Sequence, residues 1–389
     1  MFEDVVIAGG GPAGSFAALI LAQAGVRVRI CDRAVFPRDK LCGDTLNPGA
    51  LAVLARHLHT SVVLAASIPI DGMVLTGPGD VSVHGRYGDG VHGRAITRRA
   101  LDQWLITTAS AAGAIVEERT RVIGPLVTDD EVRGVRVRGK AGGEQSRPAR
   151  VTIAAEGRRS PLASALGLAR QPSTPRRWAI GAYFASVDGV GTAGEMHVRS
   201  GHYVGVAPTA GGLANVCYVS SRAAGADWRA PASLLESTVR SDAQLRWRFA
   251  RAVRASAVTV LGPMAVDVEM PGRPGLLLAG DAAGFIDPMT GDGLRLALEG
   301  AELAADVTLD VLAGRISRTR MARELGDRRR ARFRAKWRFN RAMRRLVDYP
   351  AGVAGAALAA RWLPGLFAQM IRYAGDCETS AKCREPVNQ

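Results

Sequence analysis

The fold of this chain is decided by residues 4–32, DVVIAGGGPAGSFAALILAQAGVRVRICD. The apolar run 4–8 is typical of a buried parallel strand, and a glycine cluster follows it directly. Residues 13–24 are mostly good helix formers, Gly25 is a suitable C-terminal stop, and residues 26–31 read as the next strand. The stretch therefore predicts a strand–helix–strand unit whose two strands are parallel.

The glycines between the first strand and the helix have the spacing of a dinucleotide-binding turn. We expect Gly9 to allow the tight turn, Gly11 to let the backbone approach a pyrophosphate, and Gly14 to let the helix pack closely on the strand. The helix N-terminus carries free amides and a positive dipole end, which attract an anion. Asp32 ends the second strand, where a carboxylate accepts hydrogen bonds from a ribose diol.

The same glycine spacing recurs twice, at residues 88–93 and 189–194. The first copy has no strand before it or helix after it, and the second runs into a segment that alternates like a strand. A bare glycine pattern is weak evidence without that context. We therefore expect no second dinucleotide domain, so electrons would enter by transient docking of NAD(P)H or from another protein.

Size and composition indicate a protein with a large hydrophobic core whose cysteines are reduced. The 389 residues are 47% hydrophobic, which is enough for two domains or one elaborated domain. No stretch is long and apolar enough to cross a bilayer, and Met1 leads straight into the first strand, so we expect no signal peptide. An odd number of cysteines without a C-x-x-C pair favours the cytoplasm, and the scattered histidines predict no metal site. The cysteines are Cys31, Cys42, Cys217, Cys377 and Cys383.

The net charge of +15 is concentrated in one segment. Residues 315–345 hold fourteen Lys or Arg against Glu324 and Asp327. Such a segment suits a solvated arginine-rich helix, an anionic membrane surface or a nucleic acid. Because no nucleic-acid recognition motif accompanies the charge, we expect no nucleic-acid partner.

Residues 33–46, RAVFPRDKLCGDTL, resemble a known family. The pattern F-P-R-D-K-x-C-G-x-x-L is similar to the segment after the ribose-binding acid in the geranylgeranyl reductase family of FAD proteins. Those proteins belong to the flavoprotein group folded like p-hydroxybenzoate hydroxylase, which also includes flavin-dependent halogenases. The resemblance places this loop, with Arg33, Lys40 and Cys42, near the flavin and the substrate. The alternative for Cys42 is a small buried residue without a chemical role.

Two further segments carry the same resemblance. Residues 98–108, RRALDQWLITT, match the family's R-x-x-L-D-x-x-L, whose arginine supports the FAD pyrophosphate and corresponds to Arg98. A solvated arginine is the alternative. Residues 154–160, AAEGRRS, resemble the family's A-D-G-x-x-S turn, with Glu156 where aspartate is usual.

Residues 275–306, GLLLAGDAAGFIDPMTGDGLRLALEGAELAAD, predict a buried strand, an acidic turn and a helix from Gly293. They resemble the G-D-A-A-G-x-x-x-P-x-x-G-x-G segment of the flavoprotein group. The resemblance implies that Asp281 accepts a hydrogen bond from the ribityl chain. It also implies that the loop 288–294 brings backbone amides and a positive helix end to the flavin pyrimidine edge, where reduced flavin carries negative charge.

The middle of the chain alternates apolar and polar residues and predicts a mostly antiparallel substrate sheet. Related reductases carry Y-x-W-x-F-P here, and this chain keeps Tyr203 and Pro208 but has Gly205 and Ala207 at the two ring positions. We therefore expect a wider pocket at that point than a slim polyprenyl chain needs. The W-x-W-x-I-P motif of halogenases is absent from the sequence.

The C-terminal segment 351–373, AGVAGAALAARWLPGLFAQMIRY, is apolar but interrupted by Arg361 and Pro364. This pattern suits an interfacial or pocket-covering helix pair better than a membrane span. Beside the basic segment, it suggests peripheral contact with the inner membrane face. Packing against the chain's own domain is the alternative.

We therefore expect an α/β protein with three parts. A discontinuous Rossmann-like FAD-binding domain comprises residues 1–66, 95–170 and 265–314; a mostly antiparallel substrate domain comprises 67–94 and 171–264; a basic and apolar helical region comprises 315–389. The cofactor-binding residues implied are Gly9, Gly11, Pro12, Ala13, Gly14, Asp32, Arg33, Lys40, Cys42, Arg98, Gly280, Asp281, Pro288, Gly291, Gly293 and Leu294, and the catalytic candidates are Cys42 and Tyr203.

The activity implied is reduction of a carbon–carbon double bond in a hydrophobic, isoprenoid- or quinone-like substrate. Reduced flavin would give the hydride, and Cys42, Tyr203 or water the proton. The rival is a monooxygenase or epoxidase that acts through a flavin hydroperoxide; Gly205 and Ala207 favour it, and Gly284, where the aromatic hydroxylases have histidine, counts against it. A basic binding protein without a chromophore is the third class.

Overall fold

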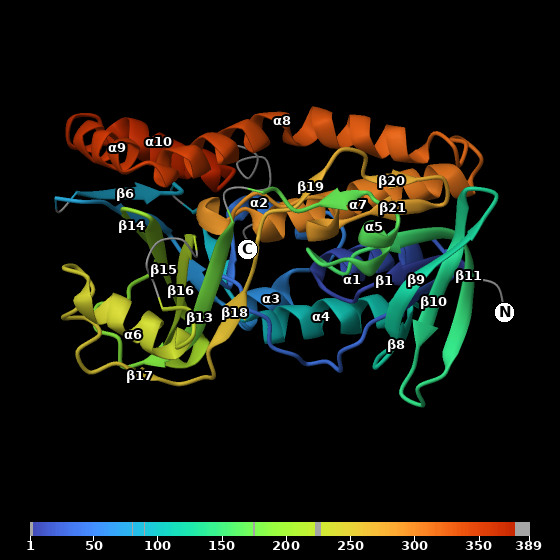
Figure 1. Cartoon of the computed structure of the whole chain (residues 1–389), viewed down its shortest axis with the longest axis horizontal. Coiled ribbons are helices and arrows are strands. Elements are labelled where there is room, and N and C mark those ends of the chain that lie inside the picture. The colour runs from blue at the N-terminus through green and yellow to red at the C-terminus, as the bar shows by residue number, and fades with distance from the viewer. Residues whose placement is uncertain (1–2, 80, 89, 174–175, 222–226, 378–389) are drawn as a thin grey trace, which may run out of the picture.

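The computed structural model describes residues 3–79, 81–88, 90–173, 176–221 and 227–377 (Figure 1). Cys383 lies outside these residues. The described chain forms two large sheets and a layer of C-terminal helices, and the mixed α/β class predicted from the sequence is confirmed.

The first sheet is built around the predicted strand–helix–strand unit. β1 (Glu3–Ala8) pairs in parallel with β2 (Val28–Cys31) on one side and with β11 (Glu144–Ala154) on the other. β8 (Ile115–Glu117) extends the sheet beyond β2, and β21 (Leu276–Leu278) extends it beyond β11. The short β20 (Gly272–Arg273) closes that edge in the antiparallel sense.

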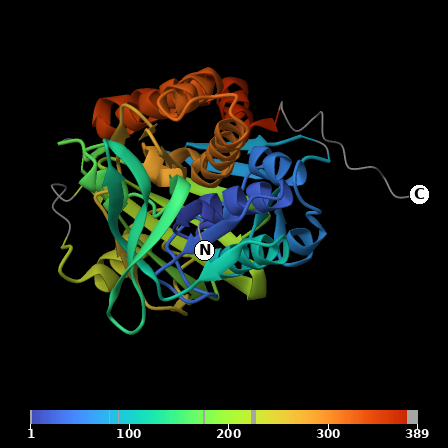
Figure 2. The same ribbon diagram turned by 90° about the vertical axis from the view of Figure 1, so that its right-hand side faces the viewer.

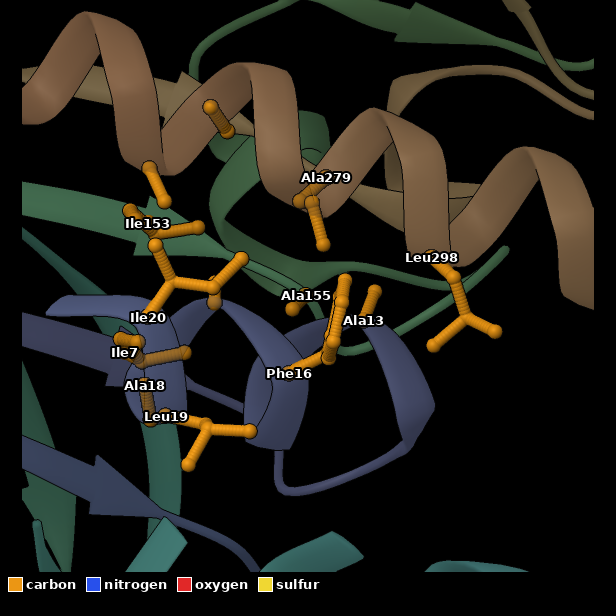
Figure 3. Close-up of a cluster of buried hydrophobic side chains, with 14 of the residues drawn as sticks. Ile7, Ala13, Phe16, Ala18, Leu19, Ile20, Ile153, Ala155, Ala279 and Leu298 are labelled. Atoms are coloured by element: carbon orange, nitrogen blue, oxygen red, sulfur yellow. The ribbon is translucent and has the colours of Figure 1, made fainter. Parts of the chain in front are cut away.

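Both faces of this sheet are covered because successive residues of its strands, which point to opposite faces, are apolar. Val5 and Ile7 pack against α1 (Pro12–Gln23), α4 (Arg98–Ala111) and α7 (Gly293–Leu312). Figure 3 shows the centre of this cluster, where Phe16 of α1 and Leu298 of α7 lie between the helices.

The opposite face of the sheet carries a second cluster. Val6 and Ala8 pack against the hairpin of β9 (Arg121–Thr128) and β10 (Glu131–Arg138), and against the short helix α5 (Pro161–Ala165). The hairpin continues the sheet by pairing β10 with the first half of β11.

The second large sheet is almost wholly antiparallel, with the order β17-β13-β16-β15-β14-β5-β6, and β18 also pairs with β13. Its one parallel pairing in the described chain joins β14 to β5. The helix α6 (Pro231–Ser241) covers one face, where Phe184 and Phe249 make an edge-to-face contact. The strands are β5 (Gly72–Thr76), β6 (Ser82–Arg86), β13 (Arg177–Ala185), β14 (Ala193–Arg199), β15 (His202–Thr209), β16 (Leu213–Ser221), β17 (Val253–Arg254) and β18 (Thr259–Leu261).

Smaller elements join the two sheets. β3 (Thr45–Leu46), β7 (Gly93–Ala95) and β4 (Ile68–Ile70) form a three-stranded sheet, and β12 (Ala169–Arg170) pairs with β19 (Asp267–Val268). The connecting helices are α2 (Pro48–Ala55) and α3 (Ser61–Ala65), with the single turns η1 (Ala210–Gly212), η2 (Gly280–Ala283) and η3 (Pro288–Thr290).

Three helices at the C-terminal end lie as one layer across both sheets, seen along the upper edge in Figures 1 and 2. They are the long α8 (Met321–Asp348), α9 (Pro350–Trp362) and α10 (Pro364–Ala374). In the part of the chain that the structure describes, no single helix has both the length and the apolar composition to cross a membrane, while α9 and α10 pass that test together with a bend of 112° between them.

Candidate active site

The turn between β1 and α1 needs glycine at two of its predicted positions. Gly9 has a φ of +94°, and a Cβ there would lie 2.6 Å from the carbonyl oxygen of Ala155. A Cβ on Gly14 would lie 1.8 Å from the carbonyl oxygen of Gly9, so only glycine lets α1 start against the turn. A Cβ on Gly11 would lie 3.5 Å from Arg38 Nη2, its nearest neighbour. Gly11 itself faces a cavity.

The Asp32 carboxylate holds this turn against the end of β2. It accepts hydrogen bonds from the backbone amides of Gly10 and Ala34, both at 2.7 Å, and it is buried. Asp32 does not line the cavity, and Arg33 is exposed to solvent outside it. The structure thus gives Asp32 a bond to the turn itself, while the contact of either side chain with a cofactor stays a prediction.

A cavity of about 250 Å³ lies between the two large sheets. It brings together residues from motifs that are far apart in the sequence. Those that sequence reasoning singled out and that line it are Gly11, Pro12, Ala13, Lys40, Cys42, Arg98, Tyr203, Gly280, Asp281, Pro288, Gly291, Gly293 and Leu294. The N-terminal glycine turn and the turn before α7 pack closely at Gly280. A Cβ on Gly280 would lie 2.8 Å from Ala13 Cβ.

Basic side chains face the cavity close to the glycine turn. Lys40 has no ion pair or hydrogen bond within the described residues, and its burial, reinforced by the positive charge of Arg98, lowers the pKa of its ammonium group to about 8. Arg98 is buried and forms two hydrogen bonds with Asp102, at 2.7 and 2.8 Å. Arg158 lies 3.7 Å from Asp281 and was missed in the sequence, although it belongs to the A-x-G-x-x-S turn.

These groups fit a pyrophosphate. An unpaired ammonium, two guanidinium groups and the N-terminus of α1 are donors of the kind that bind phosphate oxygens. The open side of Gly11 leaves room for the anion to approach the backbone. The residues present therefore suit the diphosphate of FAD.

The Cys42 loop is fixed to the second sheet by a buried hydrogen-bonded group that we call the Asp44 hub, formed by Asp44, Tyr183 and Asn215. Tyr183 Oη and Asn215 Nδ2 both donate to the Asp44 carboxylate, the latter at 2.7 Å. Asn215 Nδ2 also donates to the carbonyl oxygen of Cys42 at 2.8 Å. Burial raises the pKa of Asp44 to about 6.

The Cys42 thiol lines the cavity, and burial raises its pKa above the usual value. The thiol therefore keeps its proton at neutral pH. That state suits a group that gives a proton to a substrate carbon, and it makes Cys42 a poor nucleophile.

Tyr203 is less suited to the role of proton donor than the sequence suggested. Its hydroxyl donates to Asp287 Oδ1 at 2.7 Å, and Asp287 Oδ2 is 3.0 Å from Arg177 Nη1. Burial and the negative charge of Asp287 raise the pKa of Tyr203 well above the usual value. The hydroxyl proton is thus engaged by the Asp287 carboxylate, and the assignment of Tyr203 as a proton donor stays a prediction.

Gly205 and Ala207 both line the cavity, where related reductases carry rings. A Cβ on Gly205 would find no atom closer than 3.9 Å, so a methyl group would fit there in ordinary van der Waals contact.

An apolar chamber of about 140 Å³ adjoins the cavity beneath the C-terminal helices. The two spaces share wall residues Met73, Met196, Thr290, Ile371 and Ala374. The remaining walls of the chamber come from β5, β14, α8, α9 and α10, and they are almost entirely aliphatic, aromatic or methionine side chains.

A buried group of charges joins the α7 start to the C-terminal layer. Lys336 Nζ of α8 lies 3.4 Å from Asp292 and 3.0 Å from Asp376, and it donates to the carbonyl oxygens of Tyr373 and Ala374. Burial raises the pKa of Asp292 to about 7, while the nearby Lys336 opposes that rise. The loop before α7 and the end of α10 are thereby tied to one ammonium group.

A glycine turn at one end of a cavity and a second helix start at the other are the arrangement of FAD-dependent oxidoreductases. The chain belongs to the FAD binding domain family, which matches residues 3–335. It is 32% identical over 318 residues to menaquinone reductase from Mycobacterium tuberculosis, which covers 78% of this chain and 76% of that protein. It is 30% identical over 315 residues to digeranylgeranylglycerophospholipid reductase 1 from Methanopyrus kandleri, covering 79% and 81%.

Solved structures share the fold. A geranylgeranyl bacteriochlorophyll reductase-like protein from Thermoplasma acidophilum superimposes with a TM-score of 0.77 at 23% identity, covering 89% of this chain and 88% of that one. The myxobacterial chondrochloren halogenase CndH gives 0.80 at 24% identity, covering 87% and 81%. The fold is thus common to reductases and halogenases, and the predicted geranylgeranyl reductase resemblance is confirmed.

Proposed function

We propose that the protein uses FAD to reduce a carbon–carbon double bond of a hydrophobic substrate with an isoprenoid or quinone character. The observation that carries this proposal is that the cofactor cavity, with Cys42 in its wall, lies beside the apolar chamber and shares five wall residues with it. A lipid-like tail would occupy the chamber while the reacting bond stays in the cavity. The names of the two reductase relatives support this choice.

Bound FAD in its reduced form supplies a hydride, and the chain supplies the remaining proton and the geometry. Cys42 Sγ gives its proton to the carbon that does not receive the hydride, and solvent restores that proton after product release. The Asp44 hub holds the Cys42 backbone in place during this step. Transient NAD(P)H docking or an electron-donor protein returns two electrons for the next turnover.

The test is anaerobic reduction of the purified, flavin-loaded protein followed by addition of a menaquinone or a polyprenyl lipid. We expect the substrate to reoxidise the flavin without oxygen and to gain two hydrogens by mass spectrometry. Cys42→Ala should slow this step about 100-fold or more while flavin binding is retained. Cys217→Ala is the matched control, since Cys217 also lines the cavity but donates to Asn215 Oδ1.

A monooxygenase is the second candidate, favoured by the small residues Gly205 and Ala207 in the cavity wall. Its signature is a slow reaction with alkenes, fast reoxidation by oxygen and an oxygen atom in the product. That outcome would replace the proposed reduction. Halogenation is not proposed, because the W-x-W-x-I-P motif is absent from the sequence and the likeness to halogenases concerns the fold.

A further inference from the structure

The outward face of α9 is unusually apolar for a surface in contact with water. α9 buries Val353 and Ala360, and its opposite face exposes Ala351, Leu358 and Trp362. A helix that is apolar on both faces is expected to be covered on both. Here one face covers the apolar chamber, and the other face lies open in the described structure.

The bend between α9 and α10 concentrates this apolar surface. The six consecutive residues 361–366, RWLPGL, are all exposed, and we call them the corner. The side chain of Trp362 is 79% exposed, and Leu363 and Leu366 are exposed by more than half. Arg361 is the one charged residue in the corner, and residues 349–375 contain no Asp or Glu.

A stripe of arginines runs along the C-terminal half of α8. Arg334, Arg338, Arg341 and Arg345 recur every three or four residues, so they share one face of the helix, and all four are exposed. Within the described residues none of them has a carboxylate partner, whereas Arg328 and Arg330 do. Their positive charge is thus uncompensated by the protein itself.

The exposed corner and the arginine stripe together indicate what kind of partner binds this surface. A bilayer with anionic lipids offers phosphates to the arginines and an interfacial layer that accepts tryptophan and leucine. A soluble acidic partner would satisfy the stripe and leave the corner exposed, and a second copy of this chain would bring its own arginines against the stripe.

We propose that the corner inserts into the head-group region of an anionic bilayer while the arginine stripe of α8 binds lipid phosphates. The inner faces of the same helices line the apolar chamber, so docking would place that chamber beside the lipid. The inference goes beyond the proposed function and does not depend on it, because binding to a bilayer needs no substrate.

The experiment is sedimentation of the flavin-loaded protein with vesicles of phosphatidylcholine alone or with 30% phosphatidylglycerol. We expect binding to the anionic vesicles that weakens at high salt. Trp362→Ala with Leu363→Ala should reduce the partition coefficient about tenfold. Arg341→Gln with Arg345→Gln should reduce it about fivefold for each charge removed.

Matched controls come from exposed positions outside the C-terminal layer. Trp247, with a side chain 72% exposed, lies after α6, and Trp247→Ala should leave vesicle binding unchanged. Arg121→Gln with Arg240→Gln removes the same charge from other exposed positions. Flavin content and circular dichroism confirm that each variant is folded.

Three results would overturn the proposal. One is equal binding of the corner variant and the Trp247 variant. Another is equal loss of binding for the two arginine pairs, which would show a general charge effect. The third is absence of binding to either vesicle, in which case sedimentation velocity of the wild type and the corner variant shows whether a second copy covers the corner.

Discussion

At the scale of single residues, Lys40 gives the clearest prediction for cofactor binding. Its ammonium group faces the cavity unpaired within the described residues, and its pKa is lowered to about 8. A diphosphate binds the protonated form, so FAD affinity should be constant below pH 8 and fall above it, by up to about tenfold per pH unit. Lys40→Met should weaken binding and remove this slope.

The measurement is quenching of flavin fluorescence on titration of the apoprotein between pH 6 and 9.5. Lys140→Met, in an exposed turn, is the matched control and should keep the wild-type curve. If Lys40→Met retains the wild-type affinity and slope, the cationic group does not bind the diphosphate.

Glu156 gives a prediction for stability and pH. Its Oε1 atom is buried without a hydrogen-bond partner in the described structure, and Ser160 donates to Oε2 at 2.7 Å. Burial raises the pKa of Glu156 to about 7, so the folded state binds a proton that the unfolded state releases above its ordinary pKa near 4.5. Stability contributed by the protonated form is therefore lost as pH rises from about 4.5 to 7.

Glu156→Gln, which resembles the protonated acid, should then stabilise the protein at pH 8 by up to about 3 kcal/mol. At pH 5 the stabilisation should be smaller, about 1 kcal/mol or less. Thermal unfolding of both proteins at the two pH values, with matched flavin content, makes the comparison. An equal change in Tm at pH 5 and pH 8 would show that Glu156 does not titrate in this range.

Some of these single-residue contacts could be predicted from the sequence, and others could not. The turn at Gly9 and Gly14 was predictable because its requirements are local: a tight bend and a helix start within a few residues. The Asp44 hub was not, since its bonds to Tyr183 and Asn215 span 139 and 171 residues. Pairings over such distances follow from how the two sheets meet, and no short pattern in the sequence encodes them.

At the scale of elements, the position of α10 depends on one side chain of α8. Lys336 is buried and bonds the end of α10 and Asp292 at the start of α7. Its removal leaves the buried Asp292 and the partly buried Asp376 without that cation, while Arg295 still lies 3.0 Å from Asp376. Lys336→Met should therefore destabilise the protein by about 3–5 kcal/mol.

Hydrogen exchange shows whether the loss of stability in Lys336→Met is confined to α10. We expect residues 364–374 to lose protection more than β1 does, because the fixed point of α10 lies on α8. Arg338→Met is the matched control, since Arg338 lies on the exposed face of the same helix. Uniform loss of protection across the molecule would show that Lys336 stabilises the whole fold and not α10 in particular.

The helix starts and strands of the first sheet followed from the sequence, whereas the role of the C-terminal helices did not. The apolar pattern of residues 351–373 was equally consistent with a membrane contact and with packing on the chain itself. The structure shows that inner residues such as Val353 and Ile371 line the chamber. One pattern can serve both purposes because α9 carries apolar residues on two faces.

At the scale of the whole molecule, the cavity lies where the two sheets and the C-terminal layer meet, and the passage to the chamber that the proposed function requires can be closed by substitution. Met196 of β14 lines both spaces. Met196→Trp should fill the passage without touching the glycine turn, so flavin content should stay the same. If a lipid tail occupies the chamber, turnover of a long-tailed quinone should fall at least tenfold while a tail-free quinone is reduced at the wild-type rate. The ratio of kcat/KM for the two quinones measures this, with the exposed Met270→Trp as control. An equal loss for both quinones would mean that the passage holds no tail and that the chamber serves only to pack the helices.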